Sequence, residues 1–484
     1  MLLTFLIALP LLTACFIAFL EAKHVRFIGK AVFLSSALEL AFILVLIPRV
    51  VSDGGVEASA LFSLDPLGAF VSLIVALGGF FASLYSVGYL RAEVEKGIIG
   101  NHRVRQYFLS FKLFFFAMFL AVATMSPVVM WIAIEATTLS TAFLISFYNK
   151  QSATEAAWKY LIINSLGLLL SLLGTLLFLA LPDLREGSFT WSMLRESAGS
   201  LEPLIIKIAF VFVLVGYGTK IGFVPLHTWK PDTYSKAPTP IAALLSSVLL
   251  NVAFLAILRF KELTDMTLQS NFTSELFIFF GVLSIVFSAL IIFIQKNYKR
   301  LLAYSSIEQA GLIALGFGFG GIGVTAALLH MLYHALAKAL IFFTAGNIFL
   351  KYSSTKMHHV TGMIRMLPLS GPVLFVAFIA LLGLPPFGIF MTEFLMLSAG
   401  MERYPFVVAG VVLALAILFF GFFKHLIALL FGTPPDGMVR GESNMLTQLP
   451  LVLLLGLLLV LSWYLPETLS MLIRLAGEGL SLNS

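Results

Sequence analysis

Runs of about twenty mostly apolar residues follow one another along almost the whole chain, and they dominate what it can fold into. One such run is long enough to cross a bilayer as a helix. Of the 484 residues, 60% are apolar and 11% are charged, whereas soluble domains carry about 25% charged residues. The sequence therefore predicts an all-α, multi-pass membrane protein that forms a single transmembrane domain over residues 1–484.

The apolar runs predict about fourteen transmembrane helices. They are expected at residues 1–20, 28–50, 67–90, 107–126, 128–148, 160–182, 203–226, 238–260, 274–294, 301–322, 324–350, 368–398, 405–431 and 447–466. The first run has neither a basic start nor a small-residue cleavage site, so we interpret it as a retained helix and not as a signal peptide. The weakly amphipathic tail, residues 466–484, is expected at the membrane surface.

The basic residues alternate in number from one predicted loop to the next. Loops with odd numbers hold 19 of the 30 Lys and Arg residues, among them Lys230 and Lys299, and loops with even numbers hold 6. Since cytoplasmic loops are enriched in Lys and Arg, we expect the odd loops in the cytoplasm and both termini on the outer side. The same bias accounts for the net charge of +6, so no nucleic-acid partner is expected.

Two of the predicted helices are interrupted by proline. Pro225 breaks the seventh in GTKIGFVPLHTW, and Pro385 and Pro386 break the twelfth in LLGLPPFGIFMTEF. Prolines often only kink membrane helices. However, paired interruptions in corresponding halves, each with an ionisable residue nearby, are typical of a transporter's ion path. We therefore predict two inverted five-helix core repeats, at about residues 107–260 and 274–431.

Four charged residues fall near the midpoints of predicted spans, namely Glu135, Lys220, Lys338 and Glu393. An ionisable side chain at membrane depth costs several kcal/mol unless it is paired or hydrated, so each is a candidate functional residue. A carboxylate beside a cation has a switchable proton, and a buried lysine can release and rebind one. We interpret the four as a proton relay; static buried ion pairs are the alternative.

Histidines and further polar groups extend this row. His330, His334 and Lys338 recur every four residues and so share one helix face. Histidine titrates near neutral pH, which suits a proton path, although core histidines and, with little weight, haem ligands are alternatives. His227, just after the first break, and Glu308, near the start of the tenth span, are expected to support the path. For His227 the alternative is a loop hydrogen bond, and for Glu308 an interaction with the helix dipole.

Other residues at membrane depth are left open. Lys112 and Lys207 are near span ends and are expected to extend their amines to the interface, whereas Glu39 lies mid-span and is ambiguous. The single cysteine, Cys15, excludes a disulfide and an iron–sulfur cluster held by this chain alone. No cluster with metal-ligand spacing is found, so neither a metal nor a cofactor is expected in the chain.

Several of these segments resemble the antiporter-like family. This family comprises the proton-pumping membrane subunits of respiratory complex I, the large subunits of multi-subunit Na+/H+ (Mrp) antiporters, and matching subunits of group 4 membrane-bound [NiFe] hydrogenases. The resemblance spans about residues 105–400 and is carried by WIAIEATTLS, GTKIGFVPLHTWKPDTYSKAPTPIAALL, YKRLLAYSSIEQAG, LHMLYHALAKALIFFTAGNI and LGLPPFGIFMTEF. The stretches EATTLSTAFLISFYN and AWKYLIINSLG are most similar to the hydrogenase-4 component F type.

The resemblance implies a proton-translocating subunit of a redox-driven complex of the group 4 hydrogenase or formate hydrogenlyase type, in a prokaryotic inner membrane. It implies a [NiFe] centre and iron–sulfur clusters in partner subunits. The partners would be other antiporter-like and small membrane subunits and peripheral redox subunits, with lipid around them. A Na+/H+ antiporter subunit, a complex I pumping subunit and a non-pumping spacer remain alternatives. Asn251 stands where several relatives carry a lysine, so Lys338 is expected to serve as the central lysine.

Overall fold

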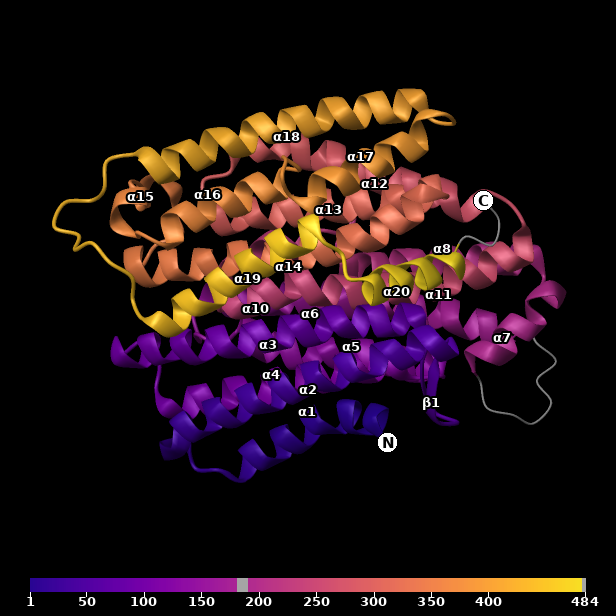
Figure 1. The fold of residues 1–484 in the computed structure, drawn as a ribbon, viewed down its shortest axis with the longest axis horizontal. Coiled ribbons are helices and arrows are strands. Elements are labelled where there is room, and N and C mark those ends of the chain that lie inside the picture. Colours follow the sequence, from indigo (N-terminus) through magenta and orange to yellow (C-terminus); the bar gives the residue numbers. More distant parts are fainter. Residues whose placement is uncertain (181–189, 481–484) are drawn as a thin grey trace.

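The computed structural model of the chain describes residues 1–180 and 190–480. Most of its long helices run side by side along the longest axis (Figure 1). The N-terminus and the end of α20 (Glu467–Glu478) lie toward the end that carries the hairpin of β1 (Val56–Ser59) and α7 (Trp191–Ser197), and the loop after α18 (Pro405–Phe431) reaches the opposite end. The predicted end of the sixth span, at residue 182, lies outside the described residues.

The first half of the chain contains two short strands and a series of helices. They are α1 (Leu2–Phe19), η1 (Ala22–His24), α2 (Val25–Asp53), β1 (Val56–Ser59), β2 (Phe62–Leu64), α3 (Pro66–Glu95), α4 (Asn101–Ala123), α5 (Pro127–Ile145), α6 (Gln151–Ala180), α7 (Trp191–Ser197), η2 (Ala198–Ser200), α8 (Pro203–Ile221), α9 (Trp229–Lys236), α10 (Thr239–Leu244), the π-helical turn η3 (Leu245–Leu249) and α11 (Leu250–Leu268). The antiparallel hairpin of β1 and β2 was not predicted.

The second half, as far as the structure describes it, is helical. Its elements are α12 (Phe272–Ile291), η4 (Ile292–Ile294), α13 (Tyr298–Phe319), α14 (Ile322–Tyr352), η5 (Met357–His359), α15 (Met363–Met366), α16 (Ser370–Leu381), α17 (Gly388–Met401), α18 (Pro405–Phe431), α19 (Met445–Trp463) and α20 (Glu467–Glu478). Helix α20 forms most of the predicted amphipathic tail, and it packs against α2, α3 and α14.

Twelve helices among the described residues are long and apolar enough to cross a membrane. The prediction of an all-α, multi-pass membrane protein is therefore confirmed, although the hairpin is a small addition. The two remaining predicted spans are also helical. Residues 301–322 correspond to the more polar α13, and residues 368–398 form the two shorter helices α16 and α17 instead of one long span.

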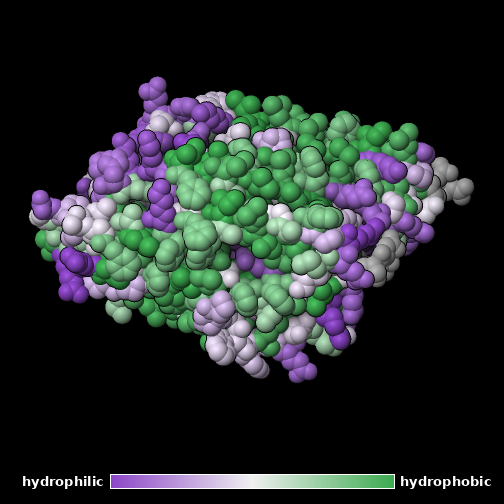
Figure 2. All heavy atoms as spheres, turned by 90° about the horizontal axis from the view of Figure 1, so that it is seen from above, coloured by the Kyte–Doolittle hydropathy of each residue, from purple (hydrophilic) through white to green (hydrophobic). Residues whose placement is uncertain are grey.

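The distribution of apolar side chains fits a membrane setting. The segment from α10 to α11 and helix α14 are almost entirely buried, whereas α6, α18 and α19 present many apolar side chains outward. Figure 2 shows a broad hydrophobic band in the middle of the molecule and hydrophilic residues gathered toward both ends. A soluble monomer rarely exposes so large an apolar surface.

Both proline segments interrupt a helix. Helix α8 ends at Ile221. The next residue, Gly222, has a φ of +80°, which does not fit a right-handed helix, and α9 begins only at Trp229. Gly383, with a φ of +62°, lies between α16 and α17 in the same way. The first break is held in place by Trp229, whose Nε1 donates to the carbonyl of Thr219 at 2.9 Å.

Candidate functional site

Glu135 of α5 and Lys220 of α8 are connected through a threonine. The Lys220 Nζ donates to the Thr138 hydroxyl at 2.7 Å, and that hydroxyl donates to Glu135 Oε2 at 3.3 Å. Lys220 also donates to the Tyr160 hydroxyl at 2.9 Å. The expected partners are therefore adjacent, but they form no direct ion pair. The neutral residues Thr138 and Tyr160, which sequence reasoning missed, supply the contacts of the buried ammonium group.

Glu135 is less buried than its apolar sequence context predicted. Its side chain is half-buried and lies beside Ile132 and Leu139, which are 52% and 55% exposed. The Ser165 hydroxyl of α6 donates to Glu135 Oε1 at 2.8 Å. The carboxylate therefore lies near the lateral surface of the helix bundle, where lipid or another subunit can contact it.

Lys230, which the sequence placed in a cytoplasmic loop, is buried. It lies in α9, directly after the first break; it is 1% exposed, and its Nζ has no hydrogen-bond partner among the described residues. A Cβ added to Gly222 would approach its Cδ to 2.6 Å, so glycine leaves room for the lysine stem. The loop prediction failed because the segment turns back into the bundle. The neighbouring His227 is also buried, and its Nδ1 has no hydrogen-bond partner in the part of the chain that the structure describes.

Helix α14 carries the expected row of His330, His334 and Lys338, all completely buried. The two imidazole rings are parallel, with centroids 6.4 Å apart. Lys338 donates to the Ser305 hydroxyl and, at 3.2 Å, to the carbonyl of Leu302 on α13. Neither ring nitrogen of His334 has a partner among the described residues. The charge of Lys230 acts on both His334 and Lys338, which connects the first break to this row.

Gln309 of α13 organises the far end of the row. Its Nε2 donates to Glu308 Oε1 at 2.8 Å, and its Oε1 lies 2.7 Å from His330 Nε2. The other ring nitrogen of His330 lies 2.8 Å from the Thr392 hydroxyl of α17. Glu393, which follows on α17, is half-buried and also contacts Gln309. Sequence reasoning missed Gln309, although a buried amide directly after Glu308 was a usable signal.

Unpartnered polar atoms gather around this row. Helix α10 packs against α9, α14 and the turn η3, and η3 also packs against α11 and α14. Several buried side-chain atoms in these elements and in the segment just before α9 have no hydrogen-bond partner among the described residues: His227 Nδ1, Lys230 Nζ, Thr233 Oγ1, Tyr234 Oη, Thr239 Oγ1, Ser247 Oγ, Asn251 Oδ1 and both ring nitrogens of His334. Buried polar groups are costly unless hydrogen-bonded, and internal water commonly satisfies them. The region is suited to hold a chain of water molecules.

Asn251 lies in this region and makes a local hydrogen bond within its own helix segment. It is fully buried in α11, and its Nδ2 donates to the carbonyl of Ser247 at 2.6 Å. The π-helical turn η3 ends two residues before Asn251, and such turns often occur at functional sites. Its free Oδ1 can bind a water molecule but cannot carry a charge.

The ambiguous residues of the first helices form a separate pair. Lys112 of α4 donates to Glu39 of α2 at 2.7 Å, and both side chains are almost completely buried. The Ser35 hydroxyl also donates to Glu39, and Lys112 also donates to the Ser36 hydroxyl. The expectation that Lys112 extends to the interface is therefore wrong. Lys207, by contrast, is exposed near the start of α8.

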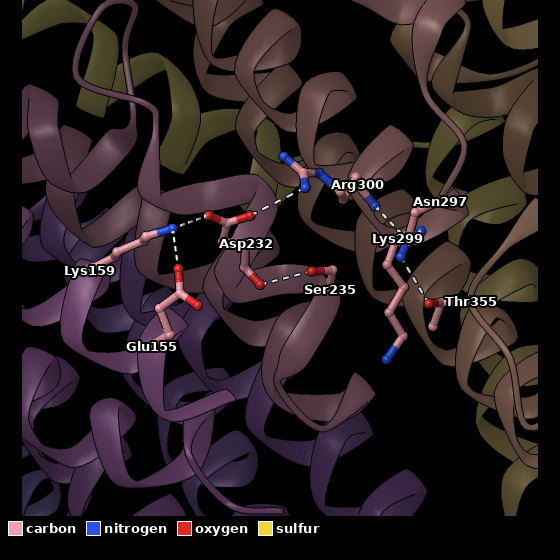
Figure 3. A network of polar contacts seen from close by, with 8 residues as sticks. All are labelled: Glu155, Lys159, Asp232, Ser235, Asn297, Lys299, Arg300 and Thr355. Carbon is pink, nitrogen blue, oxygen red and sulfur yellow. Dashed lines mark hydrogen bonds and ion pairs between the residues drawn. The ribbon is translucent and has the colours of Figure 1, made fainter. Parts of the chain in front are cut away.

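A network of charges ties α9 to both halves of the chain (Figure 3). Asp232 accepts from Lys159 of α6 at 3.3 Å and forms an ion pair with Arg300 of α13 at 3.4 Å. Lys159 also pairs with Glu155 at 2.7 Å. These side chains are partly exposed, so each pair contributes about 0–1 kcal/mol. Their effect is to position α9, which carries Lys230 into the interior.

Among the described residues, no group of three or more His, Cys, Asp or Glu is placed to hold a metal ion.

Comparison with known proteins places the chain in a family. A family model described as NADH:quinone oxidoreductase/Mrp antiporter, TM, matches residues 124–419. The hydrogenase-4 component F homolog of Methylacidiphilum infernorum (isolate V4) is 37% identical over 404 residues, which are 82% of this chain and 84% of that protein.

Two solved assemblies contain a chain with the same fold. One is the membrane-bound sulfane sulfur reductase, an archaeal respiratory membrane complex, with a TM-score of 0.86 and 24% identity. The other is the Mrp complex from Dietzia sp. DQ12-45-1b, with a TM-score of 0.86 and 20% identity. Each match covers 99% of this chain and 97% of the other. The resemblance seen in the sequence is confirmed, and the chain belongs to the NADH:quinone oxidoreductase/Mrp antiporter family of multi-pass membrane subunits.

Proposed function

We propose that this chain translocates protons as a membrane subunit of a redox-driven complex of the group 4 membrane-bound hydrogenase or formate hydrogenlyase type. The observation that carries the proposal is the row of buried ionisable residues from Lys220 through Lys230, His334 and Lys338 to Glu308, with unpartnered polar atoms beside it. The likeness to a hydrogenase-4 component F homolog supports this kind of complex.

The row begins at the Thr138 bridge. When Glu135 is ionised, it favours the charged form of Lys220 through that hydroxyl. A change of charge or contact in a neighbouring subunit at the exposed side of Glu135 weakens this support, and Lys220 releases its proton inward. The required coupling is modest. One pKa unit corresponds to about 1.4 kcal/mol, and moving an elementary charge across 100 mV costs about 2.3 kcal/mol.

The proton then passes through the middle of the bundle. Lys230 lies between the first break and α14 and acts electrostatically on His334 and Lys338. Water bound at the unpartnered atoms of this region carries the proton between them. His227 and Asn251 support the path as water-binding groups, and Lys338 serves as the central lysine.

Glu308 and Glu393 complete the path on the outer side. The charges of Lys338 and Glu393 both act on Glu308. Gln309 lies between the two carboxylates and also contacts His330. A proton that arrives from Lys338 is shared by this group, and Glu393, which is half-buried on α17, releases it.

The membrane arrangement belongs to the same proposal. Helix α13 and the pair α16 and α17, added to the twelve apolar helices, make fourteen spans. We infer two inverted repeats, at about residues 107–260 and 274–431, with their broken helices at Pro225 and at Pro385 and Pro386. Both termini are assigned to the outer side of a prokaryotic inner membrane. The [NiFe] centre, the iron–sulfur clusters and the other antiporter-like, small membrane and peripheral redox subunits are assigned to partner chains.

The test is the variant Lys220→Ala in the assembled complex. Redox-driven proton uptake into inverted vesicles is expected to fall at least about tenfold, which corresponds to about 1.4 kcal/mol. The matched control is Lys207→Ala, because Lys207 lies on the same helix but is exposed. Full pumping at normal redox turnover in Lys220→Ala would show that the relay role is wrong.

Two measurements separate the related functions. Transport that depends on sodium, in a preparation without redox proteins, would favour the Na+/H+ antiporter subunit, which the likeness to the Mrp complex supports. Co-purification with NADH-oxidising subunits in place of a [NiFe] large subunit would favour a complex I pumping subunit.

A further inference from the structure

Glu93 is a buried carboxylate that the proposed relay does not use. It lies in the last turn of α3, at the end of the bundle assigned to the cytoplasm, yet it is 0% exposed. The Tyr148 hydroxyl donates to its Oε1 at 2.5 Å, and its Oε2 has no hydrogen-bond partner among the described residues. Glu95, two residues further, is exposed and pairs with Arg91 at 2.8 Å.

A carboxylate that serves only the fold has a different environment in this chain. Glu442 accepts from the amides of Leu369 and Ser370 at 3.1 and 2.9 Å on one oxygen, and from the Ser370 hydroxyl at 2.8 Å on the other. Both of its oxygens are therefore satisfied. Glu93 has one free oxygen, which is costly in a buried carboxylate unless a proton or water binds there.

Basic groups face Glu93 from the cytoplasmic end. Lys299 is almost completely buried near the start of α13, and its charge acts on Glu93, as does that of the exposed Lys96. In Figure 3 the Lys299 side chain extends away from the network of Asp232 and Arg300. These amines offset part of the cost that burial imposes on an ionised Glu93.

Three tyrosines, Tyr148, Tyr89 and Tyr85, lie in series between Glu93 and the interior of the bundle. The Tyr148 hydroxyl lies 3.2 Å from that of Tyr89, and the Tyr89 ring stacks on Tyr85 with centroids 5.7 Å apart. Tyr89 and Tyr85 are completely buried, and the Tyr85 hydroxyl donates to Asn347 Oδ1 of α14 at 3.0 Å.

The inner end of this series meets the polar region of the relay. A Cβ added to Gly346 would clash with the Tyr85 hydroxyl and would lie 3.2 Å from Thr239 Cβ, so both side chains lie against that glycine. The Thr239 hydroxyl is one of the unpartnered atoms. Gly346 and Lys338 are on the same helix, about two turns apart.

We propose that Glu93 is the cytoplasmic proton-uptake site of this chain, and that Tyr148, Tyr89 and Tyr85 conduct protons from it toward Lys338. This inference rests on the proposed function above. In each transfer a hydroxyl oxygen accepts one proton and passes on its own, so the tyrosines are unchanged. The rings of Tyr89 and Tyr85 stack, so water carries the proton between their two hydroxyls. Water between Tyr85, Thr239 and Lys338 completes the connection.

The test compares Glu93→Gln with Glu95→Gln in vesicles that contain the assembled complex. Glutamine keeps the size of the side chain and an acceptor for Tyr148, but it cannot take up a proton. Redox-driven proton transport is expected to fall at least about tenfold in Glu93→Gln and to stay within about twofold of the wild type in Glu95→Gln. Glu93→Asp, which keeps the carboxylate, is expected to recover part of the transport.

Lys220→Ala, measured in parallel, separates this inference from the proposed function. If Lys220→Ala loses transport and Glu93→Gln does not, Glu93 is not the uptake site and the proposed function stands. If both variants transport fully, both proposals are wrong. Should Glu93→Gln fail to assemble, Tyr148→Phe removes the first hydroxyl of the route while keeping the ring, and full transport in that variant would overturn the inference.

Discussion

Lys220 and Glu135 are joined through one hydroxyl group: Thr138 Oγ1 lies 2.7 Å from the lysine Nζ and 3.3 Å from Glu135 Oε2. A direct ion pair would hold the lysine charge firmly at one place. Through a neutral hydroxyl the Glu135 carboxylate stabilises the lysine charge less strongly. A small displacement of α5 or α8 is then enough to break one of the two hydrogen bonds. The bridge is therefore the point at which we expect coupling to be most sensitive.

Thr138→Val should uncouple the pair while preserving the shape of the side chain. Loss of a hydrogen bond to a charged group costs about 1.5–3 kcal/mol, so transport is expected to slow about tenfold or more. The control is Thr137→Val, because Thr137 is equally buried on α5 but donates only to the carbonyl of Ile134. Equal transport rates in the two variants would show that the Thr138 hydroxyl is not part of the path.

Lys230→Met should separate stability from function. The amine of Lys230 is buried without a hydrogen-bond partner among the described residues, so replacing it removes a desolvation cost. The thermal unfolding midpoint in detergent is expected to stay the same or rise, while proton transport is lost. Lys236→Met, on the exposed side of the same helix, is expected to leave both unchanged. A fall in the midpoint without loss of transport would assign Lys230 a structural role.

The sequence predicted what depends on local pattern. Apolar runs gave the membrane fold, prolines gave the helix interruptions, and the four-residue spacing placed His330, His334 and Lys338 on one face. The burial of Lys230 was not predicted, because a lysine in a cytoplasmic loop and a lysine in a segment that turns back into the bundle have the same local sequence pattern. Sequence reasoning also missed neutral bridges such as Gln309, since an amide at membrane depth is a weaker signal than a charge.

Contacts between segments that are distant in the sequence could not be predicted either. Glu39 and Lys112 lie on α2 and α4, and nothing in either helix alone shows that the two pack together. Each residue was therefore considered separately, and Lys112 was expected at the interface. The structure shows that their charges are compensated by each other.

Glu39→Leu should destabilise the chain because it leaves Lys112 buried without its counter-charge. Removal of one partner of a buried ion pair costs about 3–5 kcal/mol, so the thermal unfolding midpoint in detergent should fall clearly. The double variant Glu39→Leu with Lys112→Met removes both charges and is expected to recover most of the loss. If the double variant were as unstable as the two single variants combined, the pair would not act as a unit.

A pH-dependent contribution to stability is expected from Asp65, just before α3. Its carboxylate accepts from Arg259 at 2.8 and 2.9 Å and from the amide of Gly68 at 2.9 Å. Burial acts to raise the pKa of Asp65, but the charge and hydrogen bonds of Arg259 more than offset it, so the pKa lies below its ordinary value of 3.8. The folded state therefore favours the ionised carboxylate.

The sign of the effect follows from this lowered pKa. The stabilisation is fully present above the ordinary pKa and is lost as the pH falls through the lower pKa of the folded state. The unfolding midpoint of the wild type should exceed that of Asp65→Asn above about pH 5, and the difference should shrink as the pH is lowered toward 3 and below. Asp53→Asn, at an exposed aspartate near the end of α2, is the control and should show little difference at any pH. A difference between the wild type and Asp65→Asn that stayed constant down to the lowest pH would mean that the Asp65 charge contributes no stability, because a contribution from that charge must disappear when the carboxylate is protonated.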